Sequence, residues 1–303
     1  MKKILITGAD GFTGRYLANE LQRAGYEVHG TVHKPLADGV ASVAKLHVAD
    51  LSDAARLTAV VQEVQPQQVV HLAAIAFVAH GDVDALYRTN VVGTRNLLEA
   101  LVQGKAPIEK VLLASSANVY GNSVGGVLDE STPAAPANDY AVSKLAMEYV
   151  ARLYAERLPM VLVRPFNYTG VGQSESFLIP KIVNHVRRRA PLIELGNLEV
   201  ARDFSDVRTV VQCYCRLLQA DAAMVLGQTF NVSSGRAWTL NEVLSMVRKI
   251  SGHPFEVRVN PAFVRQNEVK LLLGSNAELE SAIGALPPIA LADTLRWMLE
   301  ASV

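Results

Sequence analysis

The feature that most constrains this chain is a glycine-rich turn close to its first residue. An apolar run at residues 3–7 leads directly into Gly8, Gly11 and Gly14, and apolar residues then recur at helical spacing as far as Gly25. Glycines at these spacings permit a tight turn, let the backbone approach a pyrophosphate and let a helix pack closely on the strand. The amide groups at the start of such a helix favour phosphate. The segment therefore predicts a strand–turn–helix unit that holds a dinucleotide.

The rest of the first half alternates short apolar runs with helical patterns. This alternation is typical of a parallel sheet with helices on both faces. It predicts an α/β fold with a Rossmann-type, doubly wound parallel sheet. The expected strands are residues 3–7, 26–32, 45–48, 68–72, 110–114 and 160–163, and the expected helices are residues 14–24, 54–64, 91–101 and 140–157.

The alternation loosens beyond about residue 167, which indicates a second, smaller domain. Loops bearing Pro, Gly and Arg separate expected helices at residues 179–189, 207–220, 239–251 and 291–299. A short strand at residues 229–232 is expected to rejoin the main sheet. We therefore assign residues 1–166, joined by 207–232, to a dinucleotide-binding domain. Residues 167–206 and 233–303 form the expected C-terminal substrate domain.

Composition narrows the range of partners. Lys plus Arg and Asp plus Glu number 29 each, so nothing favours nucleic acid or an anionic membrane as a partner. No run approaches the roughly 20 apolar residues of a membrane span. Cys213 and Cys215 are two residues apart and point to different sides of one element, so we expect buried packing rather than a disulfide or a metal site. We expect a cytoplasmic protein that binds no metal.

The residues after the second and third expected strands choose the cofactor. An acidic residue at the end of the second strand would hold the ribose hydroxyls of NAD. This chain has His33 and Lys34 there, which could bind a 2′-phosphate. We therefore favour NADP(H), with NAD(H) as the alternative and a simply solvated Lys34 as the competing interpretation. Asp50 and Leu51 are expected at the adenine. Further expected cofactor contacts are Phe12, Thr13, Leu72, Ala73 and Ala74, and Asn90 is either a site residue or a helix cap.

A candidate proton-transfer group follows the fifth expected strand. That strand ends at Ser115 and Ser116, and Tyr140 and Lys144 come next on one face of an expected helix. An ammonium favours phenolate, so we expect Lys144 to lower the pKa of Tyr140. Such a phenol can exchange a proton with a carbonyl or hydroxyl oxygen while a serine hydroxyl holds that oxygen and a nicotinamide exchanges hydride. We expect Ser116 to be this serine, with Ser115 as the second choice.

With these motifs the chain resembles the extended short-chain dehydrogenases that act on nucleotide sugars. The resemblance runs the full length, through TGADGFTG, HLAA, SSANVYG, YAVSK, RPFNYTG and RDFSDV. Within that group, residues 164–170, 196–199, 202–207 and 271–274 resemble the GDP-4-keto-6-deoxy-D-mannose reductases, which form GDP-D-rhamnose. The resemblance implies that Tyr140 is the general acid, that Lys144 binds the ribose and that Ser116 orients the ketone.

The resemblance also implies a set of substrate residues. Asn167 would lie near the phosphates, and Arg202 and Arg265 would clamp the diphosphate, since the guanidinium fork binds phosphate oxygens in pairs. Surface salt bridges are the alternative for both arginines. Ser115, Lys181 and Glu268 complete the expected substrate contacts.

A homodimer is implied as well, through a four-helix bundle of the helices at residues 91–101 and 140–157. Apolar residues on both faces of these helices support it, although they could equally belong to the core: Leu97, Leu98, Met147 and Val150.

Other reactions remain open on the sequence. A UDP-galactose-type 4-epimerase with tightly bound NAD needs the same serine, tyrosine and lysine. A 4,6-dehydratase is disfavoured because Ala117 and Asn118, neither of which can be a general base, follow Ser116. A fucose-synthase-type epimerase-reductase would need a Cys and a His near the site. A non-catalytic NADP-binding sensor would not need Tyr140 and Lys144, and both are present.

Overall fold

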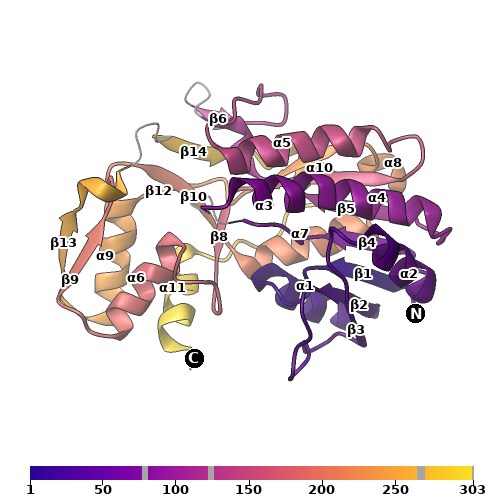
Figure 1. The fold of residues 1–303 in the computed structure, drawn as a ribbon. Helices are drawn as coiled ribbons and strands as arrows, with labels where there is room; N and C mark the ends of the chain where they lie inside the picture. Colours follow the sequence, from indigo (N-terminus) through magenta and orange to yellow (C-terminus); the bar gives the residue numbers. More distant parts are fainter. Residues whose placement is uncertain (77–80, 122–125, 265–269, 302–303) are drawn as a thin grey trace.

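The structure, a computed structural model, describes residues 1–76, 81–121, 126–264 and 270–301. Within these ranges, seven parallel strands form the central sheet in the order β11-β7-β5-β4-β1-β2-β3 (Figure 1). The strands are β1 (Lys3–Thr7), β2 (Glu27–Val32), β3 (Lys45–Val48), β4 (Gln68–His71), β5 (Lys110–Ala114), β7 (Met160–Pro165) and β11 (Thr229–Val232). The strand order reverses between β1 and β4, which is where doubly wound sheets bind ligands.

Helices cover both faces of this sheet because alternate residues of each strand face opposite sides. Ile4 and Ile6 of β1 pack with α1 (Phe12–Arg23) and α7 (Val207–Gln219). Leu5 packs on the other face, with α2 (Ala54–Val64), α4 (Gly93–Gln103) and α5 (Asp139–Arg152). Cys213 and Cys215 are buried free thiols in the first of these cores, as predicted.

The later part of the chain builds a second layer of structure beside the main sheet (Figure 1). Of the described residues, β12 (Ala237–Thr239), β10 (Ala201–Asp206), β14 (Leu271–Gly274) and β6 (Val127–Leu128) form a sheet, and β8 (Asn167–Thr169) pairs with β10. A pair of strands, β9 (Leu192–Leu195) and β13 (Glu256–Val259), lies further out. Helices α6 (Leu178–Arg187), α9 (Leu240–Ser251) and α11 (Leu291–Glu300) share a separate core. The remaining helices are α3 (Val83–Tyr87), α8 (Ala222–Val225) and α10 (Ala277–Ile283).

Most expected elements of the first half agree with the structure, and two helices differ. The expected helix at 91–101 begins later, at Gly93, because a π-helical turn occupies Arg88–Val92. The expected helix at 140–157 ends at Arg152. The strand at 229–232 pairs with β7 in the main sheet, whereas the division into two domains stays a prediction. Among the helices that the structure describes, none is both long and apolar enough to cross a membrane.

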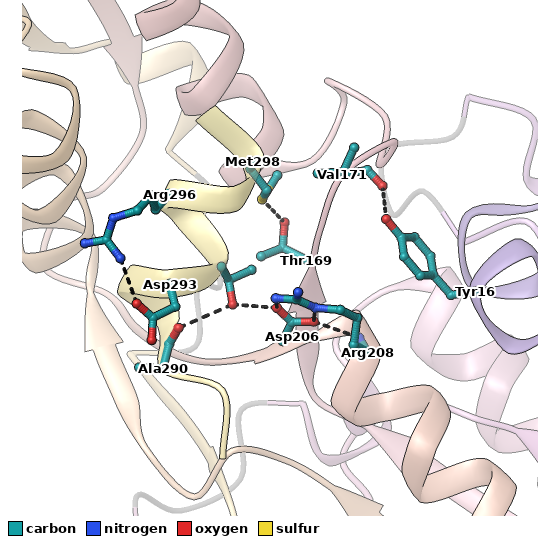
Figure 2. A network of polar contacts seen from close by, with 10 residues as sticks. Tyr16, Thr169, Val171, Asp206, Arg208, Ala290, Asp293, Arg296 and Met298 are labelled. Atoms are coloured by element: carbon teal, nitrogen blue, oxygen red, sulfur yellow. Dashed lines mark hydrogen bonds and ion pairs between the residues drawn. The ribbon is translucent and has the colours of Figure 1, made fainter. Parts of the chain in front are cut away.

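Asp206 joins the two parts of the chain at the start of α7. Its carboxylate accepts hydrogen bonds from the backbone of Arg208 (2.8 Å) and from the guanidinium of the same residue (2.7 and 2.9 Å). It also accepts a hydrogen bond from the Thr294 hydroxyl of α11, at 2.7 Å. Nearby, the Tyr16 hydroxyl of α1 donates to the Val171 carbonyl, at 2.8 Å (Figure 2). These bonds tie α1 and α11 to the start of α7 and to the loop after β8.

A buried lysine fixes the other end of α7. Lys110 of β5 is only 4% exposed, and its ammonium donates to the carbonyls of Leu217 (2.9 Å), Leu218 (3.2 Å) and Ala220 (2.8 Å). The last carbonyls of a helix lack partners within the helix and carry the negative end of its dipole. Lys110 therefore anchors α7 to the central sheet.

Replacing Lys110 with Met should lower the free energy of unfolding by about 1–3 kcal/mol, because buried carbonyls would lose a charged donor. Urea unfolding followed by circular dichroism measures the change. The matched control is Lys249→Met on the exposed side of α9, which should stay within about 0.5 kcal/mol of the parent. Equal effects of the two substitutions would contradict the anchoring role of Lys110.

Candidate active site

The glycine turn after β1 is shaped as a phosphate cradle. Gly8 has φ +69°, and a Cβ there would lie 3.0 Å from the Ala73 backbone. A Cβ on Gly14 would lie 2.2 Å from the Gly8 carbonyl oxygen, so only glycine lets α1 sit this close to the strand. Gly11 is the N-cap of α1, and no side-chain hydrogen bond caps that end. The first amide groups of α1 therefore have no side-chain cap, and this arrangement fits a pyrophosphate.

The residues beside this cradle use their side chains for packing. The Thr13 hydroxyl lies 2.8 Å from the Tyr168 hydroxyl of β8, and the Phe12 ring stacks on Tyr168 at 6.1 Å between ring centroids. Leu72 packs against the core on the α1 face, and Ala74 is half-buried. Phe12 and Thr13 lie in the first turn of α1, and their expected contact with the cofactor stays a prediction.

A neutral histidine stabilises the strand ends under the cradle. The His71 ring lies between the hydroxyls of Thr7 (2.7 Å) and Thr94 (2.9 Å), and burial lowers its pKa to about 3. Asn90 lies in the π-helical turn, where its side chain accepts from the Ile75 amide (2.9 Å) and donates to the Ile75 carbonyl (3.1 Å). Asn90 thus holds the backbone after β4.

The expected adenine end contains an ion pair that the sequence analysis missed. His33 Nδ1 lies 2.8 Å from a carboxylate oxygen of Asp50, and both side chains are largely exposed. A backbone hydrogen bond from Ser52 lowers the pKa of Asp50. Lys34 is exposed, and Leu51 is buried. Because β2 and β3 pair in parallel, His33 and Asp50, which follow them, lie close together. The order of the strands in the sheet would therefore have predicted this contact.

Tyr140 and Lys144 lie side by side on α5, which begins after Asn138. The Asn138 side chain accepts a hydrogen bond from the Ala141 amide and so caps the helix. Tyr140 is 8% and Lys144 is 5% exposed. The Lys144 ammonium donates to the Ala114 carbonyl at the end of β5, at 2.7 Å. The helix and the strand end are therefore joined through Lys144.

The expectation that Lys144 lowers the pKa of Tyr140 is wrong in this structure. Burial raises the pKa of Tyr140 to about 12, and a hydrogen bond with Ser116 is what opposes the increase. Burial also lowers the pKa of Lys144 to about 8. Burial outweighs the hydrogen bond because loss of water penalises the charged form of each group. Tyr140 is therefore a neutral phenol at physiological pH.

Ser116 is held in place by the short helical turn that follows it. Its hydroxyl accepts hydrogen bonds from the Asn118 amide (3.2 Å) and from the Asn118 side chain (3.0 Å). Ser115 differs, because its hydroxyl donates to Glu148 of α5, at 2.5 Å. In this structure Ser115 thus hydrogen-bonds to a buried carboxylate, and Ser116 is the serine that hydrogen-bonds to Tyr140.

The expected substrate residues fall into three groups. Asn167 and Arg202 lie on the neighbouring strands β8 and β10. There Asn167 donates to the Asp203 carbonyl (3.2 Å), and Arg202 donates to the Ala201 carbonyl (2.9 Å). Lys181 belongs to α6 and donates to the Glu194 carbonyl, at 3.1 Å. Arg265 and Glu268 lie outside the described residues.

The sequence analysis missed the buried partners of the strand end. Arg164 of β7 forms two hydrogen bonds to Glu148, at 2.9 and 2.7 Å. Glu148 follows Lys144 by four positions, so helical spacing could have placed both on one face. The available signal was that Glu148 and Arg164 are charged residues at positions expected in the core. Charged side chains are almost never fully buried unless they are paired.

Comparison with known proteins shows the family of the chain. The family model described as GDP-mannose 4,6 dehydratase matches residues 5–298. A GDP-6-deoxy-D-talose 4-dehydrogenase of Aggregatibacter actinomycetemcomitans is 32% identical over 284 residues, covering 93% of this chain and 91% of the relative. A GDP-6-deoxy-D-mannose reductase of Pseudomonas aeruginosa is 32% identical over 310 residues, covering 98% of this chain and 96% of the relative.

Solved structures give the same answer for the fold. A candidate epimerase from Burkholderia cenocepacia J2315 superimposes with TM-score 0.92 at 53% identity, covering 99% of this chain and 97% of that one. The structure of RMD from Pseudomonas aeruginosa complexed with NADPH superimposes with TM-score 0.85 at 30% identity, covering 99% and 98%. The chain belongs to the GDP-mannose 4,6-dehydratase family of extended short-chain dehydrogenases.

Proposed function

We propose that this enzyme reduces the 4-keto group of GDP-4-keto-6-deoxy-D-mannose to give GDP-D-rhamnose, using NAD(P)H. The observation that carries the proposal is the buried phenol of Tyr140, hydrogen-bonded to Ser116 and four positions from Lys144 on α5. The similarity to a GDP-6-deoxy-D-mannose reductase and to a structure that contains NADPH supports the substrate class and the cofactor.

The protonation states fit the reducing direction. A bound nicotinamide dinucleotide supplies a hydride to the carbonyl carbon. Tyr140, with its pKa raised to about 12 by burial, keeps its proton until the carbonyl oxygen takes it. Ser116 would hold that oxygen, and the Lys144 ammonium, four positions along α5, would stabilise the negative charge that develops on the phenol oxygen. A phenol with a raised pKa is protonated at physiological pH, which is the state that a proton donor needs.

Two other reactions were weighed against this one. A UDP-galactose-type 4-epimerase would use the same three residues with tightly bound NAD, and the likeness to a candidate epimerase keeps it as the second proposal. The 4,6-dehydratase reaction is less favoured because Ala117 offers no base. Asn118 beside it has an amide that donates to the Ser116 hydroxyl.

Replacing Tyr140 with Phe removes the proton donor and leaves the cradle unchanged. Turnover should fall about a hundredfold or more, while NADPH affinity stays nearly constant. Cofactor absorbance reports the rate with GDP-, dTDP- and UDP-4-keto-6-deoxy sugars, and NMR identifies the product. Glu156→Gln, at an exposed position beyond the end of α5, is the control and should keep full activity. Turnover of Tyr140→Phe at the wild-type rate would contradict the role of Tyr140 as proton donor. Formation of the 4-epimer of the sugar without net consumption of cofactor would favour the epimerase.

We further propose NADP(H) as the preferred cofactor, bound through His33 and Lys34. Asp50 lies against His33, and the exposed Lys34 beside them carries the ammonium that a 2′-phosphate can accept a charge-assisted hydrogen bond from. We therefore expect Lys34 to be the residue that discriminates between NADPH and NADH.

Lys34→Ala should weaken NADPH binding about tenfold, the scale of one charge-assisted hydrogen bond. NADH binding should change little, because NADH lacks the 2′-phosphate. Fluorescence titration of both cofactors provides the measurement. Lys249→Ala, far along the chain on α9, is the control. Equal weakening of NADPH and NADH would show that Lys34 does not recognise the 2′-phosphate.

We also propose a homodimer formed through α4 and α5. The residues first named for this interface are mostly core, since Leu97, Leu98 and Met147 are fully buried within one subunit. Other apolar side chains on this surface are exposed instead, namely Val92, Val142, Tyr149 and Leu153. Exposed apolar groups along one helix are typical of an interface. The cytoplasmic location expected from the sequence stays a prediction.

A further inference from the structure

A buried ion pair lies directly behind the proposed catalytic residues. Glu148 has no exposed surface, and Arg164 is 6% exposed. Arg164 binds both carboxylate oxygens of Glu148, at 2.9 and 2.7 Å, and Ser115 donates to one of these oxygens, at 2.5 Å. Burying two charges costs several kcal/mol per ion, which their attraction does not always recover. A pair kept at this depth therefore invites a functional explanation.

The carboxylate touches both segments that carry the proposed chemistry. Ser115 directly precedes Ser116 at the end of β5, and Glu148 lies one helical turn beyond Lys144 on α5. Residues four apart on a helix are neighbours, about 5–6 Å apart at Cβ. Glu148 therefore fixes the strand end through a hydrogen bond, and its negative charge lies one helical turn from Lys144, whose ammonium donates to Ala114 at the same strand end.

We infer that Glu148 is a positioning residue that keeps Lys144 protonated in the working pH range. The inference rests on the proposed function, in which the Lys144 ammonium binds the cofactor ribose and supports Tyr140. Ser115 and Arg164 hold the carboxylate in place through hydrogen bonds. This assignment gives Ser115 a different role from the substrate contact expected from the sequence.

The charges around Lys144 leave Glu148 as its counter-charge among the described residues. His71 of β4 stays neutral because burial lowers its pKa to about 3. Tyr140 stays neutral because burial raises its pKa to about 12. Arg164 of β7 is a cation bound to Glu148 by two hydrogen bonds. Burial lowers the pKa of Lys144 to about 8, and Glu148 opposes that decrease.

The sign of the effect follows from these charges. Removing the negative charge favours the neutral amine, so the pKa of Lys144 should fall. Binding that needs the ammonium should then weaken at a lower pH than in the wild type. At an effective dielectric constant of about 20, a unit charge at about 6 Å shifts a pKa by roughly two units. We expect a measured shift of about one pH unit or more.

The experiment measures NADPH affinity by fluorescence between about pH 6 and pH 10, which needs no sugar substrate. Wild-type affinity should weaken as pH rises through about 8, the pKa of Lys144. Glu148→Gln should move this decrease to lower pH, whereas Glu148→Asp keeps the charge and should leave it near the wild-type position. Glu156→Gln, at an exposed position beyond the end of α5, is the control and should leave it unchanged.

Folding is checked separately so that the test stays decisive. If Glu148→Gln alone does not fold, Glu148→Gln combined with Arg164→Met removes both charges, a change that buried pairs often tolerate. The double variant should also lose NADPH affinity at a lower pH than the wild type. An unchanged pH dependence in a folded Gln variant would overturn the inference, as would equal shifts in Glu148→Asp and Glu148→Gln.

A second readout tests Ser115. Ser115→Ala should lower kcat with little change in KM for the keto sugar, because the loss acts on the strand end. A change in KM alone would indicate that Ser115 contacts the substrate. If wild-type enzyme binds neither NADPH nor NADH at any pH, the proposed function fails. If the wild type binds NADPH and loses affinity at high pH, but Glu148→Gln does not change the pH of that loss, only the inference on Glu148 fails.

Discussion

The site depends on how deeply α5 is buried against the end of β5. Lys144 donates to the Ala114 carbonyl, and Glu148 accepts from Ser115 and Arg164. These bonds close the space behind Tyr140, and burial then sets the pKa of the phenol and of the ammonium in opposite directions. Exclusion of water raises the free-energy cost of a buried cation, and it also strengthens the interactions between the charges that remain.

The glycine turn and α5 contribute different parts of one mechanism. The turn presents backbone amides at the start of α1, where Gly14 lets the helix approach to a distance that no other residue permits. The helix α5 presents a proton donor and a cation. Asp206, Arg208 and Thr294 then hold the second layer against α7, so the proposed substrate residues on β8 and β10 keep a fixed relation to the main sheet.

Much of the main sheet could be predicted from the sequence, because short apolar stretches mark its strands, as in KILIT and MVLVRP, and the helices between them have an apolar face. The expected strands at residues 45–48, 110–114 and 229–232 match the structure. The second sheet could not be predicted, since β6, β8 and β12 have only two or three residues each and show no usable alternation. The π-helical turn at Arg88–Val92 has no periodic signature either.

The site was predictable in its residues and less so in its energetics. Motif order placed Tyr140, Lys144 and Ser116 together, but spacing alone does not reveal burial, so the direction of the Tyr140 pKa shift was wrong. The central claim is that Tyr140 is a neutral phenol ready to donate its proton. Titration of ¹³C-labelled tyrosine by NMR, with Tyr140→Phe for assignment, tests it directly. We predict that the Tyr140 signal stays that of a phenol up to about pH 11, since its pKa is about 12. A signal that titrates below about pH 8 would contradict the claim and support the lowered pKa expected from the sequence.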